Sequence, residues 1–156
     1  MEWFDPFGLV FMTVILIPNI VFALRCRDGS ANKYRNKTVE LIEQPGRIGC
    51  IGFMVFRIPG IRSGWAANES LALYLILDAL LVTLYCVLWI VFWKKKGLLK
   101  ALALSVLPSA VFLLSGILRG SVLLTVSALL FAPAHIFISC QNAKGESDDR
   151  IRTTEP

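Results

Sequence analysis

The sequence predicts an all-α membrane protein, a bundle of five transmembrane helices with the N-terminus outside and the C-terminus in the cytoplasm. The 156 residues are 56% hydrophobic, with a mean hydropathy of +0.66, whereas an ordinary soluble domain is about 45–50% apolar. Charged residues are confined to a few short segments between long apolar stretches. A soluble helix would instead carry charge along one face at helical spacing. The expected spans lie at about 7–24, 48–61, 70–93, 98–118 and 120–138.

The first apolar stretch, residues 7–24, is expected to be a retained anchor. It follows Glu2 and Asp5 and ends at Arg25, whereas a cleavable signal peptide starts with positive charge and ends in small residues. At about 1.5 Å per residue it covers roughly 27 Å, which is enough for the hydrocarbon core.

The second span is the shortest. A surface helix is expected at 38–44, and Pro45-Gly46 is expected to break it before the span begins. The span itself, residues 48–61, has 14 residues and contains Arg57 and a proline. Such a length fits a re-entrant or interfacial segment as well as a crossing. If the Arg57 side chain reaches outward to the interface, the segment can still cross.

The last three spans are longer. Residues 70–93 contain one charge, Asp78, and end in tryptophans followed by three lysines, which is typical of a cytoplasmic interface. Residues 98–118 and 120–138 are together too long for one span, so they are expected to form a helical hairpin that turns near Arg119.

The basic residues indicate the orientation. In a five-span arrangement the inside segments hold six, four and three Lys or Arg, thirteen in total, and three of the sixteen lie outside. This excess favours a single orientation with the C-terminus inside. The bundle fills residues 1–140, and the polar remainder, 141–156, is expected to be a disordered cytoplasmic tail. The basic first loop is expected to lie against anionic lipid headgroups.

Asp78 is the residue most in need of a partner, because an unpaired carboxylate in the hydrocarbon costs about 2.5–3.5 kcal/mol. By helix rise it lies roughly 12 Å below the outer end of its span, and Arg57 lies about 6 Å below the end of the neighbouring one. We therefore predict an ion pair between Asp78 and Arg57. It is either a structural lock between two helices or the proton- or cation-coupled carboxylate of a small transporter.

His135 is the candidate pH-sensitive residue, because imidazole titrates near neutral pH. Its own helix offers no acidic neighbour, so the sequence favours an interfacial histidine that bonds to a carbonyl over the pH-sensitive role. A serine hydrolase built from Ser115 and His135 is excluded by depth, since the two are expected to lie about 20 Å apart. No catalytic or cofactor-binding residues are predicted, and the protein is not expected to be an enzyme.

Metal and nucleic-acid sites are also not predicted. The four cysteines form no CxxC pair and only one histidine is present, which argues against zinc. Cys26 and Cys140 are expected on the reducing side, so no disulfide is expected. The basic residues separate the spans instead of forming one surface, which argues against a nucleic-acid partner.

Small residues recur at helical spacing in the last two spans and indicate where these helices pack closely. An interface within the hairpin explains them better than a dimer face. The two stripes are Ala101, Ser105 and Ser109 on one helix, and Ser121, Thr125, Ala128 and Ala132 on the other.

A pattern in the N-terminal part of the chain carries a family resemblance. It comprises Ile17-Pro18-Asn19-Ile20, Asn36-Lys37, Glu40, Glu43-Gln44, Gly46-Arg47 and Gly49-Cys50. The pattern resembles that of small uncharacterised multi-spanning membrane proteins of Gram-positive, Clostridium-like bacteria. Pro45 departs from it, because an aliphatic residue is expected there. The resemblance implies a bacterial plasma membrane and brings no activity with it.

Two functions remain open from the sequence. The first is a non-enzymatic accessory or interaction component of the bacterial envelope, which binds another membrane protein. The alternative is a small transporter or channel subunit that uses Asp78.

Overall fold

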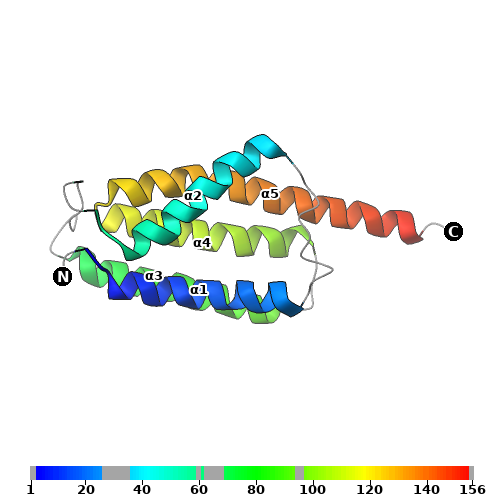
Figure 1. The fold of residues 1–156 in the computed structure, drawn as a ribbon. Helices are drawn as coiled ribbons and strands as arrows, with labels where there is room; N and C mark the ends of the chain where they lie inside the picture. Colours follow the sequence, from blue (N-terminus) through cyan, green and yellow to red (C-terminus); the bar gives the residue numbers. More distant parts are fainter. Residues whose placement is uncertain (1–2, 26–35, 59–60, 62–68, 94–96, 155–156) are drawn as a thin grey trace.

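The computed structural model of the protein describes residues 3–25, 36–58, 61, 69–93 and 97–154, with side chains up to 145. In these ranges the chain forms the five α-helices drawn in Figure 1, and the only β-type pairing in them is an isolated bridge between Phe4 and Phe56. The predicted all-α class is confirmed. The helices are α1 (Pro6–Arg25), α2 (Lys37–Val55), α3 (Ser70–Val91), α4 (Leu98–Leu118) and α5 (Val122–Thr154).

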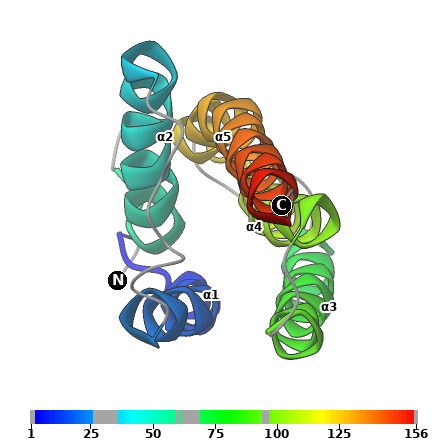
Figure 2. The ribbon, with the colours of Figure 1, turned by 90° about the vertical axis from the view of Figure 1, so that its right-hand side faces the viewer.

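Consecutive helices run in opposite directions. We call one end of the bundle the Asp5 end, where α1, α3 and α5 begin and α2 and α4 finish, and the other the Arg25 end (Figure 1). The helices pack in a ring in which α1 contacts α2 and α3, α3 contacts α4, α4 contacts α5, and α5 contacts α2 (Figure 2). The bridge between Phe4 and Phe56 joins the start of α1 to the end of α2.

Four helices are long and apolar enough to cross a membrane: α1, α3, α4 and the Val122–Gly145 part of α5. The bundle buries only 17% of the apolar window of α1 and 22% of that of α3. The large aliphatic side chains left outside suit lipid better than water. The first, third, fourth and fifth expected spans are therefore matched by suitable helices, whereas the crossing of the second stays a prediction.

Helix α2 differs from its prediction. It is one continuous helix that passes through Pro45, where a break was expected, and it ends at Val55, inside the predicted span 48–61. Asn36 caps its start, because the side-chain oxygen accepts a hydrogen bond of 3.1 Å from the Thr38 amide. Past the proline, Gly46 lies against α5 so closely that an added Cβ would be 2.8 Å from the Phe131 amide nitrogen. Packing on α5 therefore outweighs the local cost of the proline.

The predicted α4–α5 hairpin is confirmed. Gly120 has a φ of 58°, and the Ser121 amide donates to the Gly116 carbonyl at 2.9 Å while the Gly120 amide donates to the Ile117 carbonyl at 3.0 Å. These bonds make a Schellman motif, which ends α4 and reverses the chain. Gly116 then faces α5, where an added Cβ would lie 2.9 Å from the Thr125 amide nitrogen. The buried small residues of the two stripes are Ser105, Ser109, Ser121 and Ala128.

The end of α5 also differs from its prediction, since it is helical to Thr154 where a disordered tail was expected over 141–156. In Figure 1 this end projects beyond the other helices at the Arg25 end. The sequence supplies a physical reason, because residues 144–152 place opposite charges four positions apart, a spacing that favours a helix.

Candidate functional site

Asp5 occupies the start of α1 and caps that helix. Its Oδ1 atom accepts hydrogen bonds from the Phe7 and Gly8 amides, each 3.0 Å long. A carboxylate at this position satisfies free amides and is stabilised by the helix dipole. The Asp5 amide in turn donates to the Val55 carbonyl at 2.8 Å. Asp5 is therefore buried where α1 begins and α2 ends.

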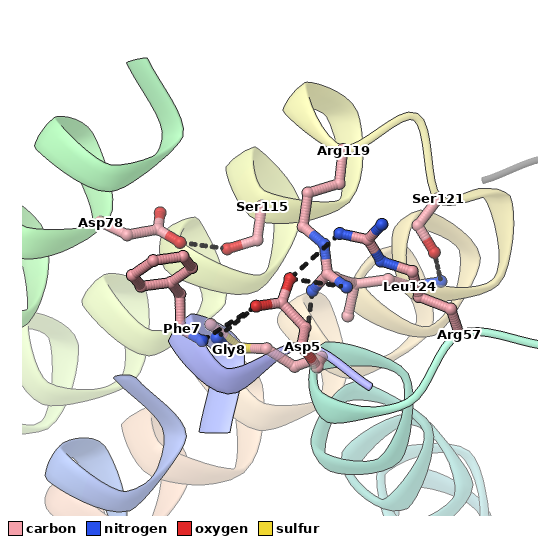
Figure 3. Close-up of polar contacts among 10 residues, drawn as sticks. Asp5, Phe7, Gly8, Arg57, Asp78, Ser115, Arg119, Ser121 and Leu124 are labelled. Atoms are coloured by element: carbon pink, nitrogen blue, oxygen red, sulfur yellow. Dashed lines mark hydrogen bonds and ion pairs between the residues drawn. The ribbon is translucent and has the colours of Figure 1, made fainter. Parts of the chain in front are cut away.

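The second carboxylate oxygen of Asp5 faces two guanidinium groups (Figure 3). Asp5 Oδ2 lies 3.0 Å from Arg119 Nη2 and 3.3 Å from Arg57 Nη2. The side chain of Arg119 is only 1% exposed, and its Nη1 donates to the Met54 carbonyl at 2.7 Å. The Arg57 side chain is 25% exposed. One carboxylate thus joins α1, the end of α2 and the end of α4.

Asp78 lies next to this group on α3 and is fully buried. Its Oδ2 accepts a hydrogen bond of 2.5 Å from the Ser115 hydroxyl on α4 (Figure 3). Its Oδ1 is buried and has no hydrogen-bond partner among the described residues. A buried carboxylate oxygen without a partner is uncommon in native proteins and calls for an explanation.

The structure gives Asp78 and Arg57 partners other than the predicted ones. Arg57 pairs with Asp5, and Asp78 bonds to Ser115. The predicted pair was based on depth along the spans and so considered only residues within them. Asp5, just ahead of the first span, brings a carboxylate directly beside the end of α2. A signal for Asp5 was present in the sequence, because an aspartate followed by a proline is typical of a helix N-cap and first turn.

The polar groups at the Asp5 end form two layers. Tyr74 and Asp78 are four residues apart on α3, and Ser115 and Arg119 are four residues apart on α4, so each pair lies on one face of its helix. The Arg119 guanidinium carbon is 5.9 Å from the centre of the Tyr74 ring. Arg119, Tyr74 and Asp5 thus form an outer layer, and Asp78 with Ser115 forms an inner layer one helical turn deeper.

A second ionic cluster lies between α2 and α5. Glu43 is 3% exposed, and its Oε1 accepts a hydrogen bond of 3.1 Å from Arg47 Nε and lies 3.2 Å from His135 Nδ1. The His135 ring stacks on Phe131 at 4.5 Å between centroids. These contacts supply the buried Glu43 carboxylate with the partners that burial of a charge requires.

His135 therefore contacts a carboxylate, where the sequence favoured a backbone carbonyl. The prediction considered acidic neighbours in its own helix only, and Glu43 comes from α2. Ser115 and His135 take part in different clusters, Ser115 with Asp78 and His135 with Glu43. Cys50, Cys86 and Cys140 carry free thiols, and Cys26 lies outside the described residues. In the described part of the chain, no group of three or more His, Cys, Asp or Glu could hold a metal ion.

Comparison of the chain with protein-family models, with curated proteins and with solved structures finds no match.

Proposed function

We propose that this chain is a multi-pass protein of a bacterial plasma membrane that acts, without catalysing a reaction, by binding another membrane protein. Its N-terminus is outside and its C-terminus is in the cytoplasm. The four apolar helices support the membrane location. Helix α2 supports a fifth crossing, because it runs from the Arg25 end of the bundle to the Asp5 end (Figure 1).

The charge distribution supports the orientation. Arg25, Lys37 and Lys100 lie at helix ends that meet at the Arg25 end of the bundle. The Asp5 end holds Arg57 and Arg119, and both pair with Asp5. An excess of Lys and Arg is typical of the cytoplasmic side, so the Arg25 end is the cytoplasmic one in this proposal.

The projecting end of α5 is the observation that carries the proposed binding role. The apolar sequence of α5 ends at Cys140, and the helix continues to Thr154, roughly 21 Å farther at 1.5 Å per residue. Residues 146–154 carry charges of both signs. Apart from Ile151 these residues are polar, so the segment has no apolar stripe to bury in the bundle and is suited to bridging to another protein. We infer that this segment docks on the cytoplasmic part of a partner.

Two variants test the docking segment. The first is truncated after Gly145, and the second exchanges a charge pair, Lys144→Glu with Asp148→Lys, which keeps opposite charges four residues apart. The full chain is expected to co-purify from membranes with one partner at a fixed ratio. Both variants should lose that partner while their helix content and thermal stability in detergent stay unchanged. Equal recovery with the truncated chain would contradict the proposal.

A membrane-impermeant maleimide tests the orientation. Cys140 should react only after the cells are opened, while Ser63→Cys should react in intact cells. Reaction of Cys140 in intact cells would reverse the proposed sidedness.

The second candidate is a small transporter or channel subunit, and buried Asp78 with its unpartnered Oδ1 favours it. The expected result for this candidate is a proton or cation flux in vesicles that Asp78→Asn abolishes. Such a flux would place it ahead of the binding role.

A further inference from the structure

We infer that Asp78 is a proton-binding site and that the ion pair between Arg119 and Asp5 closes it toward the Asp5 end of the bundle. The inference deepens the transporter candidate by naming its ligand and its gate. It takes only the choice of Asp78 from that candidate. A proton bound at this carboxyl can be detected whether or not the protein transports anything.

The surroundings of the Asp78 carboxyl bear on whether it is protonated or ionised. Asp78 is fully buried in an apolar helix, and its one hydrogen bond comes from the Ser115 hydroxyl. Within the described residues, Asp78 makes no ion pair. A carboxylate in the hydrocarbon requires a partner, a proton or water. A proton added to Oδ1 removes the negative charge, while Oδ2 still accepts from Ser115.

The guanidinium group of Arg119, the nearest cation, is bound to partners other than Asp78. Arg119 lies one turn from Ser115 on α4, yet its Nη2 is 3.0 Å from Asp5 and its Nη1 donates to the Met54 carbonyl. Arg119 is thus held toward the outer layer. Its charge also opposes a metal cation beside Asp78, and the three oxygens offered by Asp78 and Ser115 are far fewer than the six to eight that Ca²⁺ takes. The ligand that fits is the proton.

A proton that binds Asp78 has to pass the outer layer at the Asp5 end of the bundle. Three ionisable groups interact with Asp78: Tyr74 on α3, Arg119 at the end of α4 and Asp5 ahead of α1. Arg57 after α2 pairs with Asp5 farther out. Side-chain exposure falls inward, from 25% for Arg57 to 3% for Asp5 and 1% for Arg119. Separation of Arg119 from Asp5 would open the outer layer and connect Asp78 with the solvent.

A hydrophobic carbodiimide, N,N′-dicyclohexylcarbodiimide, reports the protonated carboxyl directly. The acid adds its O–H across one C=N bond to give an O-acylisourea, and transfer of the acyl group from oxygen to nitrogen then gives a stable N-acylurea. All atoms of both reactants remain in the product, so no other reactant is needed. The full chain in lipid vesicles would be treated over a range of pH values, and the modified residue would be located by peptide mass spectrometry.

The wild-type protein is expected to gain one adduct at Asp78, at a rate that rises as the pH falls, and Asp78→Asn should lose it. If Asp78→Asn does not fold, Ser115→Ala serves in its place. That change removes a hydrogen bond to the ionised form, which should raise labelling at a given pH by about tenfold or more. No adduct at Asp78, or a rate that does not depend on pH, would overturn the proton site.

Asp5→Asn tests the gate, because asparagine caps a helix as well as aspartate but carries no charge. It should speed the labelling of Asp78 several-fold, whereas Glu43→Gln in the other cluster should leave the rate unchanged. Equal rates in Asp5→Asn and the wild type would overturn the gate. Labelling without any flux would keep the proton site and reject the transporter candidate.

Discussion

Asp5 with Arg57 and Arg119 forms one ionic cluster, the Asp5 cluster. Glu43 with Arg47 and His135 forms another, the Glu43 cluster. They contain similar groups in different surroundings. In the Asp5 cluster both the carboxylate and one of its cations are buried, since the Arg119 side chain is 1% exposed. In the Glu43 cluster the carboxylate is buried, but the Arg47 side chain is 50% exposed and that of His135 is 25% exposed. The clusters therefore differ mainly in how far the positive partner is exposed at the surface of the bundle.

This difference decides how much each contact matters. Removing one partner of a buried pair strands a charge in a dry environment and costs about 3–5 kcal/mol, whereas an exposed pair contributes about 0–1 kcal/mol. We therefore expect the charges to dominate at the Asp5 end. Between α2 and α5, by contrast, the close backbone packing at Gly46 should matter more than the ion pair one turn away.

The largest effect is expected for Arg119→Gln. This change leaves the Met54 carbonyl without its charged donor and leaves Asp5 with Arg57 as its remaining guanidinium. The expected loss is about 3–5 kcal/mol of unfolding free energy, measured by denaturant titration in detergent micelles.

The double variant Asp5→Asn with Arg119→Gln is the control for this effect. It removes the buried carboxylate together with the buried guanidinium and leaves Arg57, whose side chain is 25% exposed, so it should recover part of the loss. A single variant as stable as the wild type would show that the Asp5 cluster does not hold the helices together.

Next in size is Gly46→Ala. The new methyl group would lie 2.8 Å from the Phe131 amide nitrogen and 2.9 Å from its Cα, so α2 must move away from α5, at a cost of about 1–3 kcal/mol. Gly52→Ala in the same helix is the matched control, because nothing lies within 4 Å of its added Cβ. There alanine should stabilise the helix by up to about 1 kcal/mol. Equal effects in the two variants would disprove close α2–α5 packing at Gly46.

The smallest effect concerns pH at the Glu43 cluster. Because the Glu43 carboxylate accepts a hydrogen bond from Arg47 and lies 3.2 Å from His135, the cluster stabilises the fold while Glu43 is ionised and loses this contribution when acid protonates it. Wild type should therefore exceed Glu43→Gln in unfolding free energy near neutral pH by about 1 kcal/mol or less. The difference should shrink in acid, and Arg47→Gln should reduce it. A difference that grew in acid would reverse the assigned sign.

Much of the architecture is predictable from the sequence. The expected span 98–118 coincides with α4, and the expected hairpin turns at Gly120, within two residues of the helix ends. Hydropathy and small-residue spacing are properties of one segment at a time, so they can be assessed without knowing which helices pack against it. The length of α2 was misjudged because Pro45 was weighed by local preference alone, whereas contact with α5 decides the outcome.

Hydropathy and charge spacing are enough to predict an apolar helical bundle, and they mark Asp78, Arg57 and His135 as polar groups in need of partners. The partners themselves follow from the packing of the helices: Ser115 for Asp78, Asp5 for Arg57 and Glu43 for His135. The hydrophobicity of a helix can be read from its own sequence. A contact between helices depends on their order around the ring and on the face that each turns inward. Residues 52 and 92 positions apart, such as Asp5 with Arg57 and Glu43 with His135, meet only once all five helices are in place.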